Sequence, residues 1–173
     1  MKEIYVLRHA EKDATGNITE EGRRLAVELH TRLGTFDFVY SSDRQRAVET
    51  AELLTGKSPI TDTRASAIPL TPQELKDIHE QGKNHEFGIA GVLFESDMYR
   101  PIVIEKGREL VELIKELLGK LSEYERALIV SHDGVMVAAD MILRHKELQK
   151  ADKTFAPLHG FHVSGKLSVE DLK

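Results

Sequence analysis

The chain of 173 residues contains no cysteine, no Lys/Arg-rich block and no long apolar run. The absence of cysteine excludes disulfides, thiolate catalysis and cysteine-ligated metals. A net charge of −5 without a basic cluster argues against binding to a nucleic-acid backbone. The apolar runs are too short to cross a bilayer, and the first expected strand begins too close to Met1 to leave room for a signal peptide. We therefore expect a cytoplasmic protein without nucleic-acid or membrane partners.

The composition that remains is typical of a globular protein, with 40% hydrophobic and 31% charged residues, and the length suits a single domain over residues 1–173. Short apolar runs alternate with amphipathic stretches along the chain. The runs that predict strands cover residues 2–7, 36–40, 60–63, 127–130, 155–163 and 166–169. The amphipathic stretches predict helices over residues 19–33, 42–54, 104–121 and 135–143. This alternation indicates an α/β sandwich with a mostly parallel sheet.

Hydroxyl residues mark the expected starts of three helices. Thr19 is a good N-cap, Ser42 forms a capping box with Gln45, and Thr71 forms another with Glu74. The last of these helices lies in the least regular segment, at about residues 65–101. There Gly82, Gly88 and Gly91 interrupt any regular element, so we expect an excursion of short helices and loops over a functional site.

Two of the predicted strands end in histidine. Arg8 and His9 follow the first strand, and His132 follows the apolar run at 127–130. We expect these two strands to be neighbours, which would bring both histidines to the carboxyl edge of the sheet, where α/β proteins bind ligands. Arg46, on the first turn of the helix after Ser42, is expected near the same edge. The other histidines form no pattern that indicates a metal site.

Three segments in this order carry a resemblance to a known family. They are Leu-Arg-His-Ala at 7–10, Ser-Ser-Asp-Arg-Gln-Arg-Ala-Val-Glu-Thr-Ala at 41–51, and Val-Ser-His-Asp-Gly-Val at 130–135. Together with Ile-Thr-Glu-Glu-Gly-Arg at 18–23, they resemble the histidine phosphatase superfamily, the phosphoglycerate-mutase-like proteins. The resemblance covers roughly residues 2–145. It implies a three-layer α/β sandwich, with a mostly parallel mixed sheet flanked by helices.

The resemblance also implies roles for the residues at the sheet edge. His9 would be the nucleophile that becomes phosphohistidine, and Arg8, Arg46 and His132 would surround the phosphoryl oxygens. The chemistry is consistent with these residue types. Guanidinium groups bind two oxygens at once, neutralise the transferred group and disfavour protonation of a neighbouring imidazole.

The family takes its general acid from a Leu-Arg-Glu-Ile-like stretch, for which Leu75-Lys76-Asp77-Ile78 is the nearest match. By this resemblance Asp77 would be the acid. Glu80 is the competing candidate, because Asp77 is shorter than the usual Glu, and Glu74 is less suitable because its capping role accounts for it. A phosphohistidine substrate would need no such acid, because its leaving group is easier to expel.

We therefore predict a metal-independent phosphoric monoester hydrolase of the histidine phosphatase type, without a cofactor, that forms a phosphohistidine on His9. Its partner would be a small phosphorylated substrate or a phosphohistidine protein. The alternatives are a protein phosphohistidine phosphatase and a phosphate-binding module of the same fold without turnover. A glycolytic mutase is disfavoured because only residues 11–17 separate the Arg8-His9 motif from the next helix cap. The sequence leaves open the substrate, the oligomeric state and whether residues 65–101 move as a lid.

Overall fold

Six strands form one mixed sheet in the computed structural model, which describes residues 1–172. The strands are β1 (Glu3–Arg8), β2 (Phe38–Ser41), β3 (Ile60–Thr61), β4 (Arg126–Ser131), β5 (Gly160–Ser164) and β6 (Val169–Leu172). Their order across the sheet is β3-β2-β4-β1-β5-β6. The first four in this order are parallel, whereas β5 and β6 are antiparallel to their neighbours. The predicted mostly parallel sheet is confirmed.

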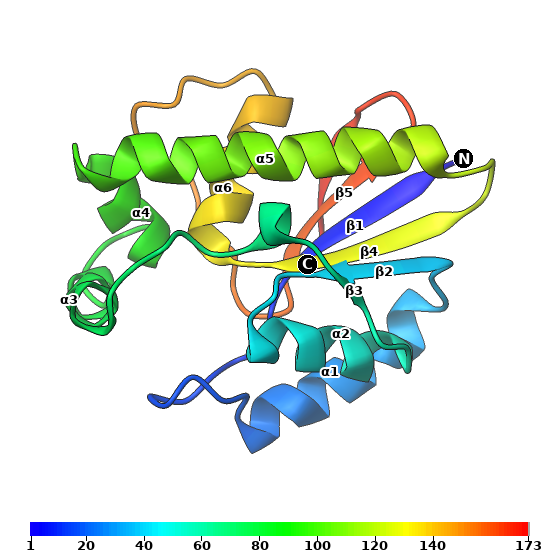
Figure 1. Cartoon of the computed structure of the whole chain (residues 1–173), viewed down its shortest axis with the longest axis horizontal. Coiled ribbons are helices and arrows are strands. Elements are labelled where there is room, and N and C mark those ends of the chain that lie inside the picture. Colours follow the sequence, from blue (N-terminus) through cyan, green and yellow to red (C-terminus); the bar gives the residue numbers. More distant parts are fainter. Residues whose placement is uncertain (173) are drawn as a thin grey trace.

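Helices cover both faces of this sheet (Figure 1). On one face lie α1 (Glu20–Leu33) and α2 (Gln45–Thr55), and on the other lie α5 (Tyr99–Lys120) and α6 (Asp133–Leu143). A short 3-10 helix η1 (Thr63–Ala65), α3 (Pro72–Gly82) and α4 (Gly88–Glu95) complete the chain. Both α3 and α4 lie at the end of the molecule toward which the parallel strands point. The three-layer sandwich predicted from the resemblance is therefore confirmed.

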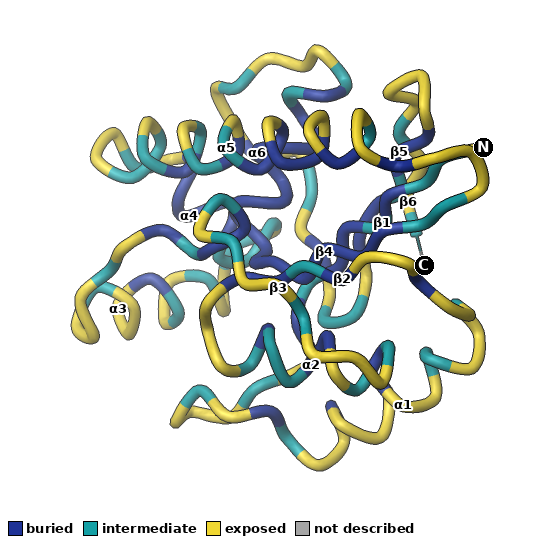
Figure 2. Tube along the Cα trace, turned by 45° about the vertical axis from the view of Figure 1, so that its right-hand side comes forward, coloured by how far each residue is buried: buried dark blue, intermediate teal, exposed yellow. Residues whose placement is uncertain are grey.

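The core follows from the alternation of side chains along the central strands. Ile4 and Val6 of β1 pack with α5 and α6, whereas Leu7, which points to the other face, packs with α1 and α2. The same alternation holds in β4, where Ile129 belongs to the first cluster and Val130 to the second. Figure 2 shows the buried residues concentrated in β1, β4 and α6, between more exposed outer helices. A continuous apolar run is what a strand buried on both faces requires.

Local capping chemistry explains two of the helix starts. The hydroxyl of Thr19 accepts a hydrogen bond from the backbone of Gly22, and Thr71 and Glu74 form the predicted reciprocal capping box. The prediction for Ser42 was wrong, because α2 begins after Arg44 and the hydroxyl of Ser42 is used elsewhere.

Two further predictions along residues 65–101 need correction. The long helix α5 begins at Tyr99 rather than near Ile104, and it tolerates Pro101 in its first turn, where a backbone N–H has no helical acceptor. Gly91 lies inside α4 instead of interrupting it, whereas Gly82 ends α3 and Gly88, with a φ of 54°, is the first residue of α4. Close packing explains Gly91, since a Cβ there would lie 2.0 Å from the ring of His85.

The first closing strand is shorter than expected, and the second, β6, spans Val169–Leu172 rather than residues 166–169. β5 begins only at Gly160, and residues 155–159 form a loop that contacts the site described below. Among the described helices, none combines the length and the apolar character that a bilayer span requires.

Candidate active site

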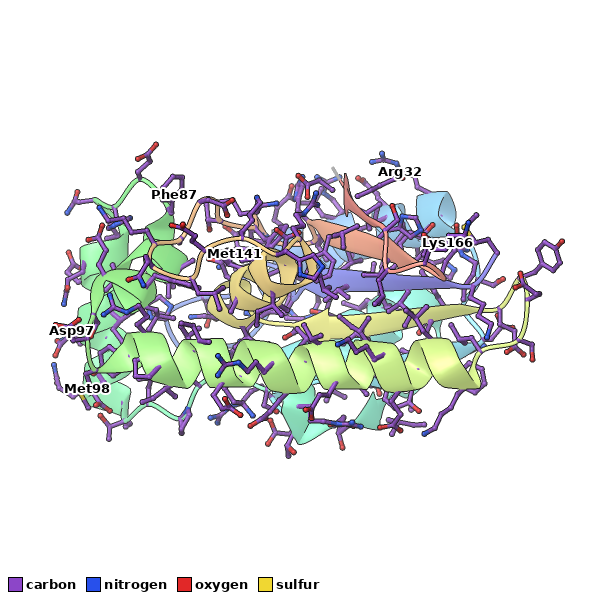
Figure 3. All side chains as sticks on the ribbon, turned by 90° about the horizontal axis from the view of Figure 1, so that it is seen from above. Arg32, Phe87, Asp97, Met98, Met141 and Lys166 are labelled. Atoms are coloured by element: carbon purple, nitrogen blue, oxygen red, sulfur yellow. The ribbon has the colours of Figure 1, made fainter. Side chains whose placement is uncertain are left out.

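The carboxyl edge of the parallel strands carries a pocket of about 300 Å³ at the end of the molecule where α3 and α4 lie. Figure 3 shows this end from above, with Phe87, Asp97 and Met98 projecting there and Lys166 at the opposite end. Residues from β1, α2, α3, α4 and α6, and from the loops beside them, line the pocket. The charged and titratable ones are Arg8, His9, Lys12, Arg44, Arg46, His79, His132 and Asp133. The structure thus brings four of the five predicted site residues together.

Backbone hydrogen bonds hold the three sequence segments in register at this edge. Arg8 pairs with Ser131 across β1 and β4, and the next amide, that of His9, donates to the carbonyl of Ser131 at 3.1 Å. On the other side of β4, the amide of Ser42 donates to Val130 at 2.9 Å. The prediction that the strands ending in Arg8-His9 and Ser131-His132 are neighbours is confirmed.

Two hydrogen bonds define the protonation of His9, which is only 4% exposed. Its Nδ1 lies 2.7 Å from the carbonyl oxygen of Ala10, so Nδ1 carries the proton and donates it. Its Nε2 lies 3.1 Å from Nε of Arg46, and since a guanidinium only donates, Nε2 is an unprotonated acceptor. Burial, together with the charges of Arg46 and Arg8, lowers the pKa of His9 to about 3. His9 is therefore a neutral imidazole whose Nε2 lone pair is available.

His132 is held in a second neutral tautomer beside it, with the two ring centroids 5.1 Å apart. Nη2 of Arg46 donates to Nδ1 of His132 at 3.3 Å, so the ring proton is on Nε2, which donates to the hydroxyl of Ser42 at 2.8 Å. Burial, followed by the neighbouring His9 and Arg46, holds the pKa of His132 well below its usual range. One guanidinium thus bridges both imidazoles.

Arg8 is anchored from the opposite side. Its Nη1 donates to the carbonyl of Phe155 and lies 3.8 Å from Oδ2 of Asp133. Asp133 is itself held by the amide of Phe155 at 2.7 Å and the hydroxyl of Thr154 at 2.8 Å. Burial raises the pKa of Asp133, although Arg8 opposes this shift. The loop before β5 therefore positions the guanidinium of Arg8, whose backbone lies at the end of β1.

The remainder of the lining divides into cations and an apolar wall. Lys12 and Arg44 add two positive charges, and burial, followed by Arg46 and Arg8, lowers the pKa of Lys12. Apolar side chains from the segment 67–75 and from α4 and α6 form the wall, and they are Ala67, Ile68, Leu70, Pro72, Leu75, Ile89, Leu93 and Val135. The site is suited to a compound with an anionic end and an apolar body.

The two carboxylates considered as general acids lie outside this lining. Asp77 is exposed and accepts a hydrogen bond from Gln73 at 2.7 Å, and Glu80 pairs with Lys83 at 2.6 Å. The titratable residue of that helix that lines the pocket is His79, which was not predicted as a site residue from the sequence. Its spacing of four from Leu75 and seven from Pro72 was the available signal, because such residues share one face of a helix.

No group of three or more metal-ligating side chains with suitable spacing occurs within residues 1–172. The arrangement in the pocket is instead one of imidazoles and guanidiniums. Such groups neutralise phosphate oxygens, and the lone pair of His9 provides a nucleophilic atom among them.

Solved structures support the same fold. YhfR from Bacillus stearothermophilus is 21% identical, with 95% of this chain and 91% of that chain covered and a TM-score of 0.73. A mycobacterial glucosyl-3-phosphoglycerate phosphatase is 19% identical, with 99% and 98% covered and a TM-score of 0.73. A phosphoserine phosphatase from Entamoeba histolytica, solved with 3-phosphoglyceric acid, is 18% identical, with 100% and 96% covered and a TM-score of 0.72.

No protein of curated function matches the chain in sequence. The family comparison is decisive, because the model of the histidine phosphatase superfamily (branch 1) matches residues 4–161, from the first strand to β5. With its mixed sheet and its Arg-His edge, the chain belongs to the histidine phosphatase superfamily.

Proposed function

We propose that the protein is a phosphatase that hydrolyses a phosphomonoester through a phosphohistidine on His9, with no metal ion or cofactor. The observation that carries this proposal is the tautomer of His9. Its Nδ1–H is committed to Ala10, so that Nε2 keeps its lone pair in a pocket lined by cations. A neutral imidazole beside two guanidiniums is the combination that attack on a phosphoryl group requires.

In the first step Nε2 of His9 attacks phosphorus, and the bond from phosphorus to the ester oxygen breaks. The Nε–H of Arg46 moves from Nε2 to a phosphoryl oxygen, which is the stronger acceptor because it is charged. Arg8 neutralises the remaining oxygens, and His132, whose Nε2–H is bonded to Ser42, holds the guanidinium of Arg46 in place through Nδ1. In the second step water attacks the phosphohistidine, and inorganic phosphate leaves as the lone pair returns to Nε2.

The pocket lining supports a small phosphorylated substrate. The phosphoryl group would lie at the cationic base, and the organic part would lie against the apolar wall that includes Leu70 and Leu93. Two of the phosphatases with this fold are named for small phosphorylated compounds, namely glucosyl-3-phosphoglycerate and phosphoserine. These names support the class of substrate and leave its identity open.

A second candidate function is hydrolysis of phosphohistidine in a partner protein. It is favoured by the outward positions of Asp77 and Glu80, because a phosphorus–nitrogen bond breaks with less assistance from an acid. Turnover of a phosphohistidine peptide, compared with turnover of 4-nitrophenyl phosphate, would separate the two candidates.

The test of the proposal is covalent labelling of His9. Incubation with a radiolabelled phosphomonoester should give acid-labile, base-stable label on His9, and the His9→Ala variant should lose label and at least about 1,000-fold in kcat. Turnover by the unaltered protein should survive a metal chelator. Wild-type rates in the His9→Ala variant would contradict the proposal. Saturable phosphate binding without turnover of any donor would instead indicate a binding module.

A further inference from the structure

One face of α3 is turned toward the pocket. Pro72, Leu75 and His79 lie on this face, spaced by three and four residues, and all three line the cavity. Asp77 lies about 200° around the helix from His79, because each residue advances an α-helix by about 100°. Of the titratable side chains that α3 contributes within the described chain, only that of His79 lines the pocket.

The ring of His79 has a defined tautomer. Its Nδ1 lies 2.7 Å from the carbonyl oxygen of Leu75 in the preceding turn, so Nδ1 carries a proton and donates it. Nε2, on the other side of the ring, is then the nitrogen that this backbone hydrogen bond leaves able to accept or donate a proton. Thr71 and Glu74 cap the start of the helix, and the hydroxyl of Tyr99 in α5 bonds to Glu74 at 3.1 Å. The helix that carries His79 is therefore fixed at its first turn.

The charged groups around His79 come from three other elements. They are Lys12 after β1, Arg46 of α2 and Arg8 of β1, and together with burial, which contributes most, they lower the pKa of His79. A phosphoryl dianion bound between these cations would offset their charges. The pKa of His79 would then rise when substrate binds, which places its proton uptake at the moment when the leaving group needs a proton.

We propose that Nε2 of His79, rather than a carboxylate, transfers the proton in both steps of the reaction. The inference rests on the function proposed above and assigns a further catalytic residue to it. As the ester bond breaks, the leaving oxygen takes the proton from Nε2 of the His79 imidazolium. Nε2 then takes a proton from water as the water oxygen attacks phosphorus and the bond to His9 breaks. The products are an alcohol and inorganic phosphate, and His79 is again protonated.

The experiment compares His79→Gln with the unaltered protein on aryl phosphates of one shape and graded leaving group. The probes are 2,4-dinitrophenyl, 4-nitrophenyl and phenyl phosphate. We expect kcat/KM of the variant to fall about 100-fold or more with phenyl phosphate, since its phenolate needs a proton, and less than about fivefold with 2,4-dinitrophenyl phosphate. Retained turnover of the latter shows that the variant is folded and that His9 still reacts.

Matched variants separate this role from packing. His30→Gln removes another histidine whose Nδ1 bonds a backbone carbonyl, that of Leu54, and His30 lies outside the pocket lining, so its leaving-group dependence should equal that of the unaltered protein. Asp77→Asn tests the acid expected from the family resemblance. If the steep leaving-group dependence appeared in Asp77→Asn and not in His79→Gln, the inference would be overturned.

Two further outcomes distinguish this inference from the proposed function. If His79→Gln lowered the rates of all three esters equally, His79 would have a structural role only, and the inference would fail while labelled His9 preserved the proposed function. If the unaltered protein turned over none of the esters and His9 took up no label, the proposed function would fail, and the inference with it.

Discussion

Ser42 acts in this structure as a partner of a site histidine. Its hydroxyl accepts Nε2–H of His132 at 2.8 Å and the backbone N–H of Arg44 at 3.1 Å. The first of these bonds keeps the proton of His132 on Nε2 and thereby leaves Nδ1 facing Arg46. A residue that resembles a helix cap in the sequence therefore determines which nitrogen of His132 faces the pocket cation.

Replacing Ser42 with alanine should weaken phosphate binding as well as stability. The buried Nε2–H of His132 would lose its acceptor, which costs about 1–3 kcal/mol and frees the ring to turn away from Arg46. We expect about tenfold weaker binding of inorganic phosphate, measured by calorimetry. Ser58→Ala, at an exposed position, is the control and should change neither quantity. If Ser42→Ala lowered the free energy of unfolding but left the phosphate affinity unchanged, Ser42 would have a purely structural role.

The site residues at the ends of buried strands, and Arg46 at the start of a helix, could be predicted from the sequence, whereas His79 in the middle of a helix could not. Arg8, His9 and His132 could be located because a strand end fixes its side chains at a sheet edge. His79 could not, because the family pattern points to Asp77 and a difference of two residues reverses the face of a helix. Which face of α3 is turned toward the pocket depends on how the segment 65–101 packs, and the sequence does not give this packing.

Two glycines of the helix α5 lie in different surroundings. Gly107 lies where α5 packs against α6, and a Cβ there would be 2.4 Å from the Cβ of Ala138. Gly119 lies near the end of the same helix, where an added methyl group would meet nothing within 4 Å among the described residues. The same amino acid is thus required by packing at the first position and only lowers helix stability at the second.

The two glycines give opposite predictions for one substitution. Gly107→Ala should lower the free energy of unfolding by about 1–3 kcal/mol, because α6 must move to admit the methyl group. Gly119→Ala should raise it by about 0.5–1 kcal/mol, because alanine restricts the unfolded chain and favours the helix. Urea unfolding of both variants measures the difference. Equal effects at the two positions would contradict the close approach of α5 and α6.

Boundaries of other elements depended on tertiary contacts that no local pattern contains. A glycine is found at position 91, within α4, because the ring of His85 occupies the space that a side chain would need. This glycine therefore marks a close contact and not the end of a helix. The strand expected over 155–163 is reduced to β5 because the amide of Phe155 bonds to Asp133 at the site. In both cases a contact with a residue outside the element decided its extent.

At the scale of the whole molecule, an acidic protein carries a local cluster of basic side chains in its pocket. The net charge is −5, yet the pocket is lined by four basic side chains and a single carboxylate, that of Asp133. Burial, together with these cations, lowers the pKa values of His9, His79 and His132 and keeps the three imidazoles neutral near neutral pH. The arrangement that suits phosphoryl transfer therefore also affects the stability of the fold.

The free energy of unfolding should fall as the pH falls from about 6.5 to about 5. In this window the unfolded chain protonates His9, His79 and His132 more readily than the folded protein does, because their pKa values are lowered in the fold, so acid favours unfolding. Each of these histidines contributes up to about 1.4 kcal/mol per pH unit. Asp133, whose pKa burial raises, acts in the opposite direction and reduces the dependence of the unfolding free energy on pH.

Urea unfolding across this pH window measures the summed effect of these groups on the free energy of unfolding. The His9→Gln variant isolates one contribution, since its unfolding free energy should change less with pH than that of the unaltered protein. If the unfolding free energy of His9→Gln depended on pH as steeply as that of the unaltered protein, the folded protein would protonate His9 as readily as the unfolded chain does. That result would contradict the neutral nucleophile on which the proposed chemistry depends.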